Sequence, residues 1–77
     1  MYDFLFPEDE RPPKSEDIQQ VRKSLGLTQS DAAKLVYRTT RQWQKYESGE
    51  IPMDLAVWQL FLLKGTVLSV KREQGMA

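Results

Sequence analysis

Two short segments that each begin with threonine most constrain how this chain of 77 residues can fold. They start eleven residues apart and read Thr28-Gln29-Ser30-Asp31 and Thr39-Thr40-Arg41-Gln42. In each, the threonine hydroxyl can accept a hydrogen bond from a free N–H group at a helix start, and the acid or amide three residues later can reach back. Both segments therefore predict helix starts. Their spacing leaves room for one short helix, a tight turn and a second helix.

Caps, stops and apolar spacing predict the other helix boundaries. Ser15 is a good N-cap, and Gly26, Gly49 and Gly65 are typical helix stops. Together these signals predict helices over residues 16–25, 29–36, 40–48 and 53–64. We expect an all-α fold, a compact bundle of four to five helices. The expected organisation is an acidic and aromatic arm over residues 1–14, a helical domain over residues 15–65 and a tail over residues 66–77.

The composition excludes several kinds of chemistry. The chain has no cysteine and no histidine, so it can form neither a disulfide nor a Cys or His metal site, and it lacks Cys nucleophiles and His acid–base catalysts. It has no run of about 18 apolar residues, and its N-terminus is acidic where a signal peptide begins with basic residues. We expect a cytoplasmic protein that is not an enzyme and that uses no metal, no cofactor, no small-molecule ligand and no membrane.

The net charge is zero, but the charges are unevenly distributed. Residues 1–17 carry six acids and two bases, whereas residues 18–77 carry nine bases and five acids. A basic body with an acidic arm is compatible with nucleic-acid binding. The alternative is an ordinary solvated surface.

The helix predicted over residues 40–48 has an apolar and a polar side. At 100° per residue, Trp43 and Tyr46 lie about 60° apart and define the side that faces a core. Arginine and lysine can bind guanine O6 and N7 in the DNA major groove, and glutamine can pair with adenine. We interpret the polar side as a base-reading face, the alternative being that it simply faces solvent. The candidate base-reading residues are Thr40, Arg41, Gln44 and Lys45.

The sequence resembles the Cro/repressor-type (xenobiotic-response-element) helix-turn-helix family over roughly residues 22–52. Two segments carry the resemblance, LTQSDAAK at residues 27–34 and WQKYESG at residues 43–49. It implies a transcriptional regulator with a helix-turn-helix, in which Gln29 contacts a DNA phosphate. The other candidate contacts to the DNA backbone are Lys34, Arg38, Thr39 and Ser48.

The same resemblance implies a structural role for Arg22 and Glu47. They align with an Arg–Glu pair that joins the first and third helices in family members, so we expect a partly buried ion pair here. The sequence also departs from the family pattern in the turn. Tyr37 stands where the family usually has a glycine, often in a left-handed conformation, and Arg38 replaces an apolar residue.

The helix predicted over residues 53–64 is apolar over most of its circumference. Because one apolar face is enough for the core of a monomer, a second face needs another surface to cover it. We expect a homodimer formed through this helix and the tail, the alternative being that the aromatic arm covers the helix. The candidate dimer residues are Leu55, Trp58, Leu62, Val67 and Leu68.

These expectations combine into two functional hypotheses. The first is a repressor or autoregulator that binds a palindromic operator in double-stranded DNA as a homodimer, with the helix over residues 40–48 in the major groove. Phage and mobile-element regulators, including anti-CRISPR-associated regulators, restriction–modification control proteins and Cro-like switches, fit this size. The alternative is an antitoxin or other interaction module whose arm binds a partner protein, with DNA binding as autoregulation.

Overall fold

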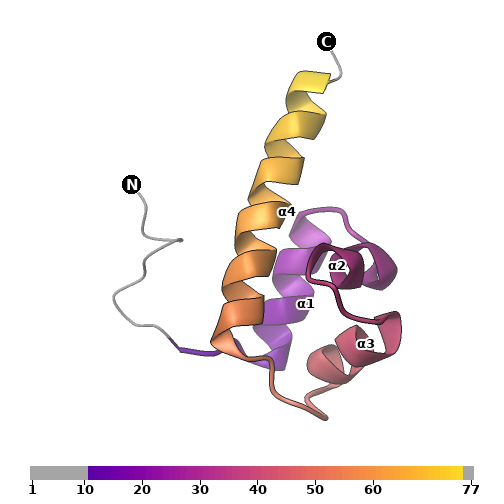
Figure 1. The fold of residues 1–77 in the computed structure, drawn as a ribbon, viewed down its shortest axis with the longest axis vertical. Coiled ribbons are helices and arrows are strands. Elements are labelled where there is room, and N and C mark those ends of the chain that lie inside the picture. Colours follow the sequence, from indigo (N-terminus) through magenta and orange to yellow (C-terminus); the bar gives the residue numbers. More distant parts are fainter. Residues whose placement is uncertain (1–10, 76–77) are drawn as a thin grey trace.

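The computed structural model describes residues 11–75, and describes side chains as far as residue 68. This part of the chain contains four helices and no strand, which confirms the all-α fold (Figure 1). Residues 1–10, most of the predicted arm, lie outside the described residues, as do residues 76–77. The helices are α1 (Ser15–Ser24), α2 (Gln29–Leu35), α3 (Thr40–Ser48) and α4 (Leu55–Gly75).

The two threonine-led helix starts are confirmed in atomic detail. The Thr28 hydroxyl accepts from the Asp31 N–H at 3.0 Å, and the Thr28 N–H donates to the Asp31 carboxylate at 3.4 Å. At the start of α3 the Thr39 hydroxyl accepts from the Gln42 N–H at 3.1 Å, and the Thr39 N–H donates to Gln42 Oε1 at 3.3 Å. Both helices therefore begin with a reciprocal capping box, which satisfies N–H groups that a helix start leaves free.

The cap of α1 differs from the prediction. Lys14 occupies the N-cap position, and Ser15 is the first residue of the helix. The reason is the position of Asp17, whose carboxylate accepts from the Lys14 N–H at 3.1 Å and so completes one half of a capping box three residues after Lys14.

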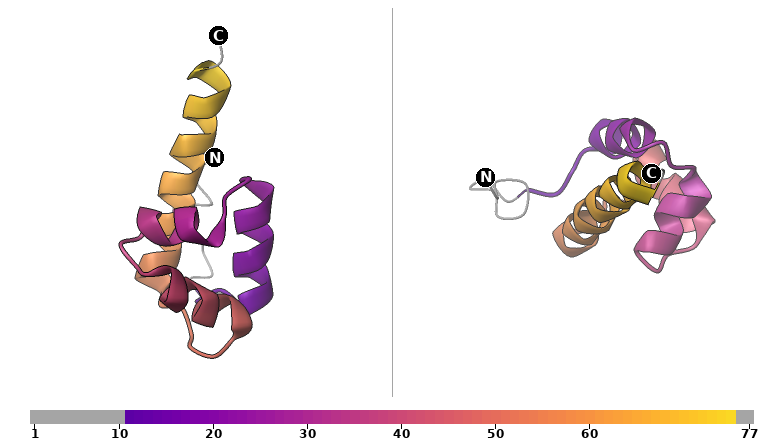
Figure 2. Two further views of the ribbon diagram at one scale, coloured as in Figure 1. Left: turned by 90° about the vertical axis from the view of Figure 1, so that its right-hand side faces the viewer. Right: turned by 90° about the horizontal axis from the view of Figure 1, so that it is seen from above.

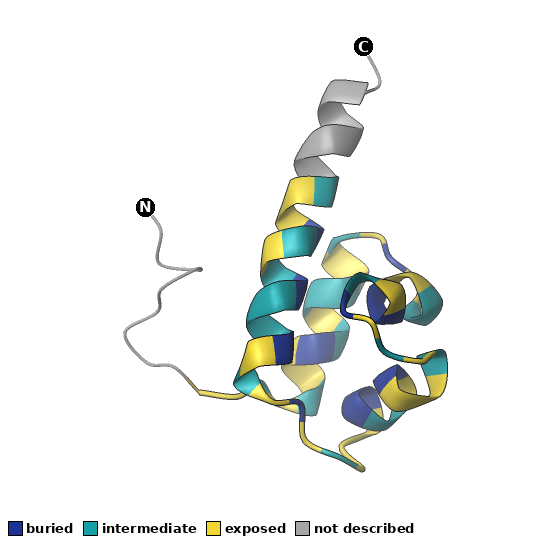
Figure 3. Cartoon of the chain, viewed as in Figure 1, coloured by how far each residue is buried: buried dark blue, intermediate teal, exposed yellow. Residues whose placement is uncertain are grey.

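A tryptophan from α3 lies at the centre of the core. Trp43 is fully buried, and its ring centroid lies 4.9 Å from that of Phe61 in α4 and 6.2 Å from that of Tyr46. The buried surfaces of the helices face one another (Figure 3). This packing holds the buried side of α3 against the core and leaves its opposite side facing outward. The buried apolar residues are Ile18, Leu27, Ala32, Ala33, Val36, Trp43, Tyr46, Met53, Val57 and Phe61.

The prediction that Gly65 ends the last helix was wrong, because α4 continues through it to Gly75. Gly65 is buried, and a Cβ atom at this position would lie 2.7 Å from Leu25 Cδ1. The glycine therefore lets α4 pack closely against the chain at the end of α1, instead of stopping the helix. Residues 66–75 are part of α4 and not a separate tail, and this half of α4 projects beyond the other helices (Figures 1 and 2).

The longest helix, α4, has 21 residues. Its sequence is interrupted by charged residues, among them Lys64 and Lys71. Within residues 11–75 no helix combines the length and the apolar character that crossing a membrane requires.

Candidate nucleic-acid interface

Helix α3 presents its polar side to solvent, as its sequence predicts. Trp43 and Tyr46 are buried in the core, whereas Arg41 and Gln44 are exposed. Lys45 and Thr40 are half-buried. The inward placement of Trp43 and Tyr46 is therefore confirmed, and it fixes which side of α3 a ligand can reach.

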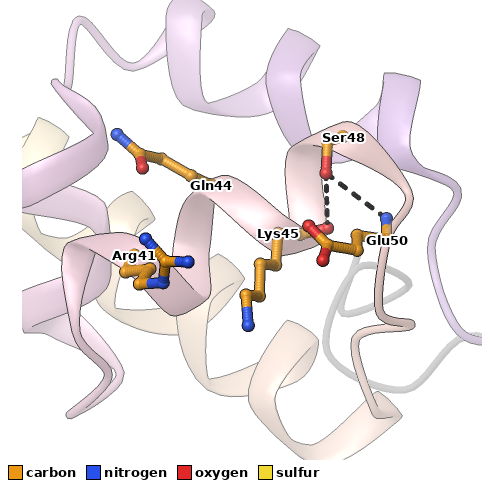
Figure 4. A pocket seen from close by; sticks show the side chains of 5 residues that line it. All are labelled: Arg41, Gln44, Lys45, Ser48 and Glu50. Atoms are coloured by element: carbon orange, nitrogen blue, oxygen red, sulfur yellow. Dashed lines mark hydrogen bonds between the residues drawn. The ribbon is translucent and has the colours of Figure 1, made fainter.

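The exposed side of α3 forms one wall of a hollow of about 220 Å³ (Figure 4). The hollow brings together three of the four predicted base-reading residues, while Thr40 does not line it. The side chains of Arg41 and Lys45 form no hydrogen bond or ion pair with any described residue, so their N–H donors are free for a ligand. The lining residues are Arg41, Gln44, Lys45, Ser48 and Glu50.

Glu50 lines this hollow although sequence reasoning did not select it. Gly49 adopts a left-handed conformation with φ of 80°, and the Glu50 N–H donates to the Lys45 carbonyl oxygen at 3.0 Å and to Ser48 Oγ at 3.3 Å. The chain therefore turns back beside the last turn of α3. The signal was present in the sequence, because a glycine that ends a helix in this conformation brings the next N–H group back to the helix.

The predicted ion pair between Arg22 and Glu47 is confirmed. The Arg22 guanidinium donates from Nε to Glu47 Oε2 at 2.5 Å and from Nη2 to Oε1 at 3.1 Å. It also donates from Nη1 to the Leu27 carbonyl oxygen at 2.9 Å. Glu47 is only 5% exposed, so this two-pronged pair joins α1 to α3 within the interior.

Two further donors to Glu47 were not predicted. The Trp43 indole Nε1–H donates to Oε2 at 2.5 Å, and Gln29 Nε2 donates to Oε1 at 3.1 Å. Burial raises the pKa of Glu47, but the hydrogen bonds from Arg22, Trp43 and Gln29 outweigh burial and hold this pKa below its ordinary value of 4.5. One ionised carboxylate thus holds three helices together.

Gln29 connects this buried carboxylate to the exposed hollow. An ionised carboxylate only accepts hydrogen bonds, so Glu47 holds the NH₂ end of the Gln29 amide. The Gln29 Oε1 atom then faces α3 and accepts from Gln44 Nε2 at 3.4 Å. Gln44 keeps its second N–H and its carbonyl oxygen for a ligand. Gln29 likewise keeps one N–H, which is the donor that its predicted phosphate contact needs.

The other candidate backbone contacts have different surroundings. The Thr39 hydroxyl caps α3, and the Ser48 hydroxyl donates to the Lys45 carbonyl oxygen at 3.1 Å. Arg38 is half-buried and donates to the Tyr37 carbonyl oxygen at 3.4 Å. Lys34 is exposed in the last turn of α2. Of these four, only Ser48 lines the hollow.

The turn between α2 and α3 keeps a left-handed residue although it lacks a glycine. Tyr37 has φ of 59° and is 75% exposed. Lys64 of α4 donates from Nζ to the Tyr37 hydroxyl at 2.8 Å, with Nζ 4.1 Å from the ring centroid. This hydrogen bond lowers the pKa of the Tyr37 hydroxyl. A contact from α4 therefore holds the side chain of the strained turn residue.

The predicted dimer residues on α4 differ in how far their side chains are exposed for contact with a second copy. Val67 is 49% exposed, and Leu63, which was not predicted, is 43% exposed. Leu55 and Leu62 are half-buried. Trp58 and Leu68 pack against the core of their own chain.

Comparison with known proteins gives no independent identification. The chain matches no model of a known protein family, and no curated protein matches it. Among the described residues no group of three or more acidic side chains could hold a metal ion.

Proposed function

We propose that this chain is a sequence-specific transcriptional regulator, a repressor or autoregulator, that inserts α3 into the DNA major groove. The observation that carries the proposal is the exposed face of α3, where Arg41, Gln44 and Lys45 line one hollow. The side-chain donors of Arg41 and Lys45 are unused there by any described residue, and Gln44 keeps one unused N–H beside the one that it donates to Gln29. The buried Trp43 on the opposite side holds this face in place. The major groove admits an α-helix, and these side chains match the acceptors on guanine and the mixed edge of adenine.

In this proposal the residues around α3 contact the DNA backbone. Gln29 reaches a phosphate with its remaining N–H while it holds Gln44 in position. Phosphate contacts fix the orientation of a protein on the duplex but carry no base information directly. The additional phosphate-contacting residues are Lys34, Arg38, Thr39 and Ser48.

We also propose that the chain acts as a homodimer formed through α4. Leu63 and Val67 leave apolar surface exposed on the helix that extends beyond the other three (Figure 1). A second copy is the fitting partner because a two-fold contact buries the same apolar residues from both chains. Such a dimer presents two copies of α3 to half-sites about 34 Å apart on a palindromic operator.

Selection of bound sequences from random double-stranded DNA tests the proposal. The wild-type protein should enrich an inverted repeat. Arg41→Ala should weaken binding by about 1–3 kcal/mol and relax the preference at a single base-pair position. Lys23→Ala removes the same charge from an exposed site on α1 and should leave every base preference unchanged. If Arg41→Ala and Lys45→Ala both preserve affinity and preference, α3 is not the reading helix.

A further inference from the structure

The hollow beside α3 contains an acid in a place where a DNA-binding surface is expected to be basic. Glu50 is exposed and shares the hollow with Arg41 and Lys45. Its carboxylate forms no hydrogen bond or ion pair with any described residue, although its backbone N–H is bound twice, by the Lys45 carbonyl oxygen and by Ser48 Oγ. The backbone of Glu50 is therefore held beside Ser48 (Figure 4), while its carboxylate has no partner among the described residues.

We propose that Glu50 determines base specificity by accepting a hydrogen bond from the N4 amino group of a cytosine. This inference rests on the proposed function, because it assigns a role within the same DNA-binding surface. A carboxylate beside DNA is repelled by the phosphates, so its presence disfavours binding unless it meets a donor. In the major groove the strong donors are the amino groups of cytosine and adenine.

The geometry of the bases favours cytosine over adenine. An ionised carboxylate only accepts hydrogen bonds. Adenine presents the N7 acceptor beside its N6 amino group, so the second carboxylate oxygen would face another acceptor, whereas cytosine presents the N4 amino group without a neighbouring acceptor. Thymine presents the O4 acceptor, which the carboxylate repels.

The neighbouring cations can read base pairs next to the pair that contains this cytosine. A guanine there presents O6 and N7, and both accept from arginine or lysine. Arg41 and Lys45 line the same hollow as Glu50 and supply these donors. The hollow therefore carries donors for guanine and an acceptor for cytosine.

The test compares the sequences that the wild type, Glu50→Ala and Glu50→Gln select from random double-stranded DNA. The wild type should prefer cytosine about tenfold or more at one position of each half-site. Glu50→Ala should lose that preference and keep the others. Glu50→Gln should switch the position to adenine, because an amide can donate to N7 and accept from N6. Glu16→Gln, the same change at an exposed site on α1, should leave the selected sequence unchanged.

The outcomes separate this inference from the proposed function. If the wild type selects a defined sequence and Glu50→Ala selects the same one with uniformly tighter binding, Glu50 acts by general repulsion and the inference is wrong. If the wild type selects no sequence, both the inference and the proposed function fail. Melting temperatures of the variants provide the folding control, and they should equal that of the wild type because Glu50 is exposed.

Discussion

At the scale of single residues, Glu47 has the largest structural role in the described part of the chain. It is the charged residue that the fold buries there, and it accepts hydrogen bonds from Arg22, Gln29 and Trp43. A buried charge that loses its partner is far more costly than a pair that is replaced as a whole. The Arg22–Glu47 pair therefore stabilises the fold only as a complete unit.

We expect Arg22→Met to lower the free energy of unfolding by about 3–5 kcal/mol, because it leaves the Glu47 carboxylate buried without its cation. The double variant Arg22→Met with Glu47→Leu should be more stable than Arg22→Met alone, since no uncompensated charge remains. Urea denaturation at low temperature measures both values. Equal stability of the single and the double variant would contradict this account of the pair.

The lowered pKa of Glu47 predicts that acid destabilises the protein. A carboxyl group whose pKa is lower in the folded than in the unfolded state contributes stability above its unfolded pKa, and this contribution is lost as the pH falls through the folded value. We therefore expect stability to decrease below about pH 4.5. Urea denaturation between pH 7 and pH 3 should show this decrease, and the Arg22→Met, Glu47→Leu double variant should show a smaller one.

The sequence predicted the main members of the α3 surface but not their connections. The helical period places Arg41, Gln44 and Lys45 opposite Trp43 because these residues lie within one helix. The bond from Gln29 to Glu47 joins residues 18 positions apart in the chain, and no local period encodes such a contact. The one missed member, Glu50, depends on the backbone reversal at Gly49.

At the scale of elements, sequence rules for helix starts and stops succeed where local hydrogen bonds decide the boundary. They fail where packing between distant residues decides it. The capping boxes at Thr28 and Thr39 fixed the starts of α2 and α3 because all of their hydrogen bonds lie within four residues. The role of Gly65 is instead set by its contact with Leu25, a residue that is close in space but distant in the sequence. Tertiary packing there overrides the low helix propensity of glycine.

Close packing at Gly65 predicts that a larger side chain destabilises α4. Gly65→Val should lower the free energy of unfolding by about 1–3 kcal/mol, because its Cβ atom would collide with Leu25 Cδ1 and the Leu25 side chain would have to leave its packed position. Thermal denaturation measures the loss. Thr66→Val places the same side chain at an adjacent exposed site of α4 and should change stability far less. A Gly65→Val protein as stable as Thr66→Val would show that the Leu25 side chain moves aside without cost, and would contradict this prediction.

At the scale of the whole molecule, α4 is the expected contact between two copies. Val67→Glu places a charge in the apolar surface proposed to be buried by the second copy, so we expect this variant to be monomeric and to bind a full palindrome about as weakly as a half-site. Thr66→Glu adds the same charge beside it, and we expect this variant to remain dimeric. Sedimentation equilibrium measures the association, and a wild type that stays monomeric at all concentrations would refute the proposed dimer.

The left-handed conformation of Tyr37 limits which residues related sequences can carry at positions 37 and 64. A glycine would adopt φ of 59° without strain, whereas tyrosine keeps this conformation with a side chain that Lys64 holds. We therefore expect positions 37 and 64 to co-vary among related sequences. Lineages that keep an aromatic residue at position 37 should also keep a basic residue at position 64, and lineages that acquire glycine at position 37 should be free to lose that base.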